Sequence, residues 1–210
     1  MKNFVKNNPV MRKLNEIENS WKDLQELKEK TKKTPIKLAI GSSWITDAGW
    51  ISTDAKYLDL LIPKHWKRLF KKNSIDAMMA EHVWEHLTLS EGVAAAKQCF
   101  EYLKPGGYLR VAVPDGFHPD SKYIEHVKVN GIGPGAEDHK VLYNYETFSN
   151  VFQQAGFRVV CLEYFDAEGE FHFVYWDPND GLIRRSKNFD RRNTNGELNY
   201  TSLIIDCYKD

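Results

Sequence analysis

The stretch from residue 36 to residue 55 constrains the fold more than any other part of the chain. Its first five residues, IKLAI, are apolar except for Lys37, a pattern found in buried strands. A turn of small residues follows at Gly41, Ser42 and Ser43, and residues 50–53 have the pattern of a second strand, which ends in the acid Asp54. The segment therefore predicts two strands whose ends bring a glycine turn close to a carboxylate.

A glycine turn beside an acid at a strand end is typical of α/β proteins that bind an adenosine-type nucleotide. The turn lets the backbone approach the ligand, and the carboxylate accepts hydrogen bonds from ribose hydroxyls. Only twelve residues separate Gly41 from Asp54, which is fewer than a crossover helix and its strand usually need. We therefore expect residues 42–48 to form a loop and the ligand pocket beside them to be open.

The rest of the chain alternates strands with helices. Apolar runs predict strands over residues 75–80, 108–113, 157–164 and 201–208, and helical periodicity predicts helices over residues 9–30, 89–103 and 145–155. Ser90 is the expected N-cap of the second helix, and the Pro-Gly-Gly at 105–107 is expected to end it. This order predicts an α/β, Rossmann-like fold with a mostly parallel, twisted sheet and helices on both faces. Because residues 201–208 follow another strand, they are expected to form an antiparallel edge strand.

The chain divides at residue 35. Residues 1–35 are expected to form an N-terminal helix and linker that pack on the core through an apolar stripe, which includes Trp21 and Leu24. Residues 36–210 are expected to form the main domain. Two long segments, 115–142 and 166–199, break its regular pattern, and we expect them to be substrate or lid loops because long excursions in compact domains are usually functional.

Composition excludes several classes of protein. Lys plus Arg and Asp plus Glu both number 29, so net charge does not favour nucleic acid as a partner. The chain has neither a secretory signal core nor an apolar run of bilayer length, which argues against a membrane protein. The three cysteines fit neither a metal-binding spacing nor a disulfide framework, and they predict reduced thiols in a cytoplasmic protein.

Taken in order, the strand ends resemble those of the class I S-adenosylmethionine-dependent methyltransferases, in particular a compact bacterial subgroup with a short glycine motif. The resemblance depends on Gly41, Asp54, the sequence EHVWEHL at 81–87, and LKPGG at 103–107. It covers about residues 36–165 and the last strand. It implies an enzyme that uses S-adenosylmethionine as cofactor and transfers its methyl group to a small-molecule acceptor.

The resemblance also implies roles for individual residues. Gly41, Ser42 and Ser43 would bring backbone against the methionine and ribose parts of the cofactor. Asp54 would bind the ribose hydroxyls, and Ala55 would lie against the adenine. The remaining two implied cofactor-binding residues, Glu81 and His82, would border the methionine group and the reacting sulfonium.

Methyl transfer needs few catalytic side chains, because the sulfonium is already activated and alignment supplies most of the rate. A general base is needed only where the acceptor must lose a proton. His118 and His139, both in the first long segment, are the candidate bases.

Two other functions remain open at this point. The shortened glycine turn would also suit a non-catalytic, methyltransferase-like binding module. Residues 82–86 spell H-x-x-E-H, so a zinc hydrolase that uses His82, Glu85 and His86 is a further alternative. That motif needs a long helix, whereas here it follows a predicted strand, so we assign no metal site from the sequence.

A basic cluster in the second long segment allows several interpretations. The cluster comprises Arg184, Arg185, Lys187, Arg191 and Arg192, with aromatic residues nearby. Arginines bind carboxylates and phosphates in pairs of hydrogen bonds, which would suit an anionic acceptor. RNA could also bind where aromatics interleave, and the aromatic residues would suit the interface of a homodimer. The favoured interpretation is pairing with the acids nearby, because exposed charge clusters are mostly solvated ion pairs.

Overall fold

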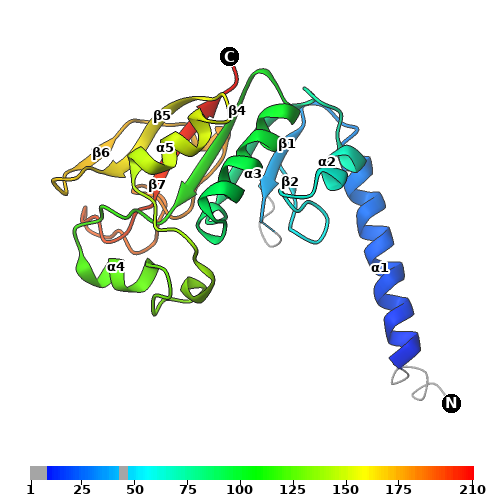
Figure 1. Cartoon of the computed structure of the whole chain (residues 1–210), viewed down its shortest axis with the longest axis horizontal. Helices are drawn as coiled ribbons and strands as arrows, with labels where there is room; N and C mark the ends of the chain where they lie inside the picture. Colours follow the sequence, from blue (N-terminus) through cyan, green and yellow to red (C-terminus); the bar gives the residue numbers. More distant parts are fainter. Residues whose placement is uncertain (1–8, 43–46) are drawn as a thin grey trace.

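The protein is a single sheet with helices packed against it (Figure 1). The structure, a computed structural model, describes residues 9–42 and 47–210, and it describes only the backbone of residues 9–17. Within this part the sheet has seven strands in the order β2-β1-β3-β4-β7-β5-β6. The strands are β1 (Lys37–Ile40), β2 (Ile51–Ser52), β3 (Ile75–Glu81), β4 (Leu103–Val113), β5 (Arg158–Phe165), β6 (Phe171–Phe173) and β7 (Leu203–Tyr208). The helices are α1 (Pro9–Lys30), α2 (Pro63–Leu69), α3 (Leu89–Tyr102), α4 (Ser121–Val127) and α5 (Tyr145–Gln153).

The predicted α/β fold is confirmed, and the sheet is mostly parallel. β1, β2, β3 and β4 are parallel to one another. β5 runs the same way, because β7 lies between β4 and β5 and is antiparallel to both. The prediction that the last strand lies at an edge is wrong. Its residues Leu203, Ile204 and Ile205 are fully buried, and a strand that is apolar on both faces is more stable inside the sheet. The antiparallel edge strand is β6, which pairs with β5.

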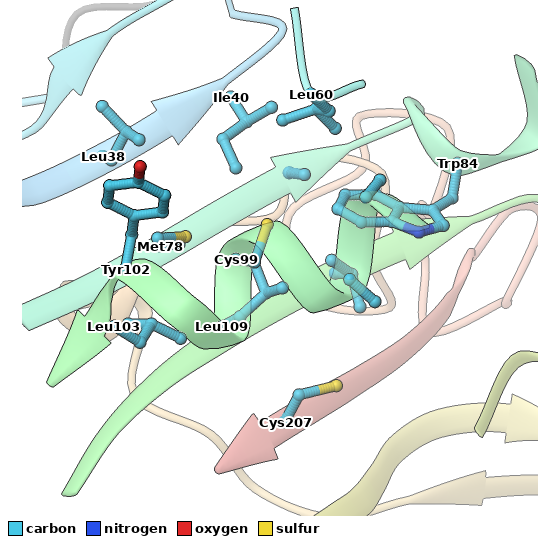
Figure 2. Packing of buried hydrophobic residues seen from close by; sticks show 14 of the residues in the cluster. Leu38, Ile40, Leu60, Met78, Trp84, Cys99, Tyr102, Leu103, Leu109 and Cys207 are labelled. Atoms are coloured by element: carbon cyan, nitrogen blue, oxygen red, sulfur yellow. The ribbon is translucent and has the colours of Figure 1, made fainter. Parts of the chain in front are cut away.

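One face of the sheet carries the main hydrophobic core. In Figure 2, α3 places Cys99 and Tyr102 over side chains of β1, β3 and β4, and Leu38 and Leu109 lie in the same layer. Helices α2 and α5 pack on this face as well, through Trp66 and through phenylalanines such as Phe152. Cys99 and Cys207 are buried, and all three cysteines are free thiols.

Helices do not cover the second face in the described part of the chain, so the prediction of helices on both faces is wrong there. Side chains on this face, Ala112, Leu162 and Ile204, pack against Trp176 and Ile183 of the segment between β6 and β7. The short β1–β2 connection leaves no room for a crossover helix. The long segment supplies the apolar cover instead.

Three charged side chains of the sheet hold this segment in place. Arg110 of β4 pairs with Asp206 of β7 and donates to the carbonyl oxygens of Asp177 and Gly181 at 3.0 and 2.9 Å. Glu163 of β5 is fully buried, and its carboxylate accepts three hydrogen bonds, from the Trp176 indole, the Lys187 amide and the Thr201 hydroxyl. Glu81, the third of these side chains, lies at the end of β3 and belongs to the site described below. Buried polar groups with complete hydrogen bonding fix a segment in one position.

Two local predictions around α3 need correction. The N-cap is Thr88 rather than Ser90, since Thr88 and Glu91 form a reciprocal capping box. The helix ends at Tyr102, before the Pro-Gly-Gly at 105–107, which lies within the next strand. β4 begins at Leu103, because Leu103 already pairs with Ile75 of β3.

The backbone of the N-terminal helix approaches the domain near its C-terminal end and points away from it toward the N-terminus (Figure 1). Leu27 is buried in the main core and Leu24 packs beside it, whereas Trp21 is 62% exposed. The expectation that Trp21 packs on the core is therefore wrong. Followed backward from its C-terminal end, α1 has already left the domain when it comes to Trp21. No helix in the described ranges has the length and apolar character needed to cross a membrane.

Candidate functional site

A cavity of about 480 Å³ lies at the carboxyl ends of the parallel strands, where open α/β sheets usually bind ligands. Its wall includes the turn after β1, the end of β3 and the residue after β4. The two long segments complete it, through residues 126–139 and through the arginine-rich stretch that leads into β7. The long segments predicted to be functional loops therefore meet over one cavity.

Gly41 forms the turn at the base of this cavity. Its φ of +65° is a left-handed conformation, and a Cβ atom at this position would lie 2.6 Å from Cγ2 of Val83, so only glycine fits here. The Ser42 amide donates to the Thr53 carbonyl oxygen at 2.8 Å. This bond places the glycine turn next to the end of β2, one residue before Asp54.

Asp54 itself faces a different hollow. It lines a smaller groove against α1, with Leu27 and Tyr57, and its Oδ1 accepts a hydrogen bond from the Lys56 amide at 2.8 Å. Ala55 is exposed and is not among the described residues that line either hollow. Ser43 lies outside the residues that the structure describes. Of the implied cofactor-binding residues, Gly41, Ser42, Glu81 and His82 line the cavity.

Glu81 holds the arginine-rich segment rather than presenting a free carboxylate. Its two oxygens accept hydrogen bonds from the backbone amides of Arg185, at 2.8 Å, and Arg184, at 3.1 Å. Next to it, His82 has a left-handed backbone with φ of 56°. Its ring nitrogens lie 2.9 Å from Ser202 Oγ and 2.9 Å from Glu85 Oε1. The end of β3 thus connects the cavity wall to the chain that enters β7.

Glu85 is the most deeply buried acid that lines the cavity, with 0% exposure. Burial opposes ionisation of this carboxyl, but the imidazoles of His82 and His86 more than offset it, and the pKa of Glu85 lies below its ordinary value. Residues Trp84–His86 form one 3-10 turn. His82 and His86 therefore do not share a helix face, and the structure does not support the H-x-x-E-H zinc-hydrolase alternative.

The two candidate bases occupy different places. His139 lines the cavity, and its Nδ1 lies 2.7 Å from the Val127 carbonyl oxygen. Since a carbonyl only accepts, Nδ1 carries the proton and Nε2 keeps a free lone pair. His118 is not among the residues that line the cavity. It is stacked on Tyr123 with ring centroids 3.9 Å apart, and burial lowers its pKa.

The arginine-rich segment is partly paired and partly free. Arg192 forms a double hydrogen bond with Asp190, and Arg184 donates to Asp47 at 2.7 Å. Pairing with an acid nearby in the sequence, the favoured interpretation of this cluster, therefore holds for Arg192, whereas the partner of Arg184 is Asp47, far away in the chain. Arg185 also lines the cavity, and within the described part of the chain its guanidinium forms no ion pair.

Several cavity residues carry no signal in the sequence. His126, Tyr200 and Pro114 line the cavity, and Ser202 holds His82. Each of them is an ordinary surface or strand-flanking residue by sequence pattern. Tyr200 and Ser202 reach the site because β7, which follows them, enters the middle of the sheet beside β4, and no local pattern predicts that.

Asp115, which follows the cavity residue Pro114, makes stability depend on pH. It is fully buried, and burial raises its pKa from 3.8 to about 6, although the amides of Phe165 and Phe117 donate to it and act in the other direction. The folded state then binds the proton more tightly than the unfolded chain. Its stabilising contribution is complete below pH 3.8 and is lost as the pH rises through 6.

We therefore expect wild type to lose up to about 3 kcal/mol of stability relative to Asp115→Asn between pH 4 and pH 6.5. Urea unfolding at several pH values measures this difference. Asp138→Asn, at an exposed position of the same long segment, serves as the control, and its curve should stay parallel to that of wild type. A constant difference between wild type and Asp115→Asn would contradict the prediction.

Comparison with known proteins gives one family. A family model described as a methyltransferase domain matches residues 9–162. No match was found among curated protein sequences. Among solved structures, the chain is similar to a SAM-dependent methyltransferase from Thermotoga maritima described as a possible histamine N-methyltransferase. The two are 16% identical over 95% of this chain and 97% of that chain, with a TM-score of 0.49.

Two more solved structures show similarity at the same level. A SAM-dependent methyltransferase from Archaeoglobus fulgidus is 13% identical, over 88% of this chain and 90% of that chain, with a TM-score of 0.49. Phosphoethanolamine N-methyltransferase 2 from Haemonchus contortus, solved with S-adenosyl-L-methionine, is also 13% identical. That similarity covers 90% of this chain and 52% of that chain, with a TM-score of 0.43.

Proposed function

The chain belongs to the methyltransferase-domain family, with S-adenosylmethionine as its cofactor, and we propose that it methylates a small anionic acceptor held in the cavity. The family match confirms the resemblance to class I methyltransferases. One observation carries the choice of acceptor. The same cavity is lined by the glycine turn at Gly41 and by the arginine-rich stretch at Arg184 and Arg185, which offers one end to the cofactor and the other to an acid group.

The residues at the glycine turn fit the cofactor. The cavity has the volume of an ordinary ligand pocket. Gly41 lines it without a side chain, and Val83 fills the space where a Cβ atom would lie. Gly41 and Ser42 would hold the methionine and ribose parts, with His82 beside them. Asp54 and Ala55 follow the neighbouring strand end but do not line this cavity, so their roles at the ribose and adenine stay predictions, as does that of Ser43 at the methionine and ribose.

Bound there, S-adenosylmethionine supplies an activated methyl group. The protein then has to place the acceptor atom in line with it and, for an acceptor that carries a proton, remove that proton. His139 suits the second task because its Nε2 lone pair is free on a wall of the same cavity. This placement favours His139 over His118 as a general base.

The free guanidinium of Arg185 selects for a carboxylate or phosphate on the acceptor. We expect Arg185→Ala to raise the KM for an acidic acceptor about 10- to 100-fold, since a hydrogen bond to a charged group contributes about 1.5–3 kcal/mol. The affinity for S-adenosylhomocysteine should stay unchanged. Labelled methyl transfer to a panel of small acids, together with calorimetric titration, measures both quantities.

Arg191→Ala is the matched control, because Arg191 belongs to the same segment but does not line the cavity. It should leave the KM unchanged. No binding of S-adenosylhomocysteine to wild type would contradict the proposed function. Binding without transfer to any member of a broad panel would instead favour a methyltransferase-like binding module.

Other features suit a cytoplasmic enzyme for small molecules. The three free thiols are typical of a reducing compartment, and the balanced charge does not favour nucleic acid. Tyr175 and Phe189 are 76% and 42% exposed, and they would suit an interface between two copies of the chain.

A further inference from the structure

Glu85 is a buried carboxylate whose charge is balanced by neighbouring imidazoles rather than by hydrogen-bond donors. In the described part of the chain, neither of its oxygens receives a hydrogen bond. His82 Nδ1 lies 2.9 Å from Oε1 as an ion pair. An ionised carboxylate without donors is costly to bury, so this group calls for a cation at close range.

Two histidines stand next to this carboxylate. His86 follows it directly, and His139 is brought there because the Lys140 amide donates to the Glu85 carbonyl oxygen at 2.7 Å. The rings of His86 and His139 meet edge to face, with centroids 5.0 Å apart. One ligand atom from each of the three side chains lies within 4.8 Å of the other two.

His139 is already oriented as a metal ligand. Its Nδ1 proton is donated to the Val127 carbonyl oxygen, which fixes the ring and leaves the Nε2 lone pair available. Metal-binding histidines usually donate their second nitrogen to a carbonyl or carboxylate in this way, and the contact sets both tautomer and orientation.

We propose that Glu85, His86 and His139 bind one divalent ion of the zinc class inside the cavity. Two imidazoles and one carboxylate are a ligand set of catalytic zinc sites, which keep a further position open. Bonds of about 2.0–2.2 Å in a tetrahedron would bring the ligand atoms to about 3.4 Å from each other. Small rotations of the two imidazoles would bring the three ligand atoms, now within 4.8 Å of one another, to this distance.

The open position of the ion would face the cavity that all three side chains line. An acceptor oxygen or sulfur bound there would lose its proton more easily, as water does on zinc. The ion would then replace His139 as the group that promotes proton loss, because it takes the Nε2 lone pair. This last step rests on the proposed methyl transfer, whereas ion binding does not. The ion would also add positive charge at the Glu85 carboxylate, on which His82 is the present partner.

Metal analysis of the full-length protein tests the site directly. We expect about one equivalent of Zn²⁺ per chain after titration and desalting. Co²⁺ in its place should give the visible absorption of a four- or five-coordinate site. His86→Ala and His139→Ala should each weaken Zn²⁺ binding by about 100-fold or more, since even outer-shell contacts change metal affinity 10- to 100-fold.

His126→Ala is the matched control. His126 lines the same cavity, but its Nδ1 is engaged by the Lys122 carbonyl oxygen within α4, and it is not part of the three-residue group. This variant should bind Zn²⁺ as wild type does, and circular dichroism should show that all variants fold. No zinc uptake by wild type, or equal loss in the His126 variant, would overturn the site while the proposed methyl transfer stands. Zinc uptake without binding of S-adenosylhomocysteine would support the site and reject the proposed function.

Discussion

Arg110→Ala is expected to destabilise the protein by about 3–5 kcal/mol, the usual effect of removing one partner of a buried ion pair. Arg110 and Asp206 are each 3% exposed and form two parallel hydrogen bonds of 2.8 and 2.9 Å. Without the guanidinium, Asp206 keeps its charge in the protein interior, with the Tyr208 hydroxyl as its remaining side-chain donor among the described residues. The carbonyl oxygens of Asp177 and Gly181 lose their donor as well.

The chain contains a matched control for this variant. Arg158 of β5 forms the same double hydrogen bond with Asp210, but these side chains are 55% and 67% exposed. Exposed pairs contribute about 0–1 kcal/mol, so Arg158→Ala should change stability little. Urea unfolding of both variants at one pH measures the contrast. Equal losses in the two variants would show that burial of the Arg110 pair does not matter.

Gly41→Ala is expected to destabilise the protein by about 2–4 kcal/mol and to weaken binding of S-adenosylhomocysteine at least about tenfold. Two costs add at this position. The φ of +65° disfavours any residue with a Cβ atom. The new atom would also lie 2.6 Å from Val83, and the resulting shift of the turn or of Val83 costs free energy of its own. Thermal unfolding and calorimetric titration measure the two effects.

Gly49→Ala separates the two costs. Gly49 has φ of +84°, but in the described part of the chain no atom lies within 4 Å of its Cβ position. The Gly49→Ala variant should therefore lose only the stability that the positive φ costs a residue with a Cβ atom. In Gly41→Ala/Val83→Ala the clash is relieved, so stability should be higher than for Gly41→Ala alone. If the double variant loses as much stability as the two single variants together, the contact with Val83 is not the cause of the loss in Gly41→Ala.

Much of the fold can be predicted from the sequence because its signals are local. The apolar run before Gly41 and the helical period over 89–103 each depend on neighbouring residues, and both are confirmed as elements at nearly those bounds. The N-cap at Thr88 can also be predicted from the sequence, since Thr88 and Glu91 have the spacing of a capping box. The position of the last strand in the sheet cannot be predicted in this way, because its register depends on partners far away in the chain.

The candidate site divides in the same way. The sequence by itself determined the glycine turn, the acid at the next strand end and the pair Glu85–His86, since each follows from residue type and position beside a strand. Only the tertiary structure decided that His139 joins that pair while His118 packs elsewhere, and that Glu81 binds the backbone of the arginine-rich segment. The physical reason is that a buried charge takes whichever partner the fold brings within a few ångströms, and distance along the chain does not predict that partner.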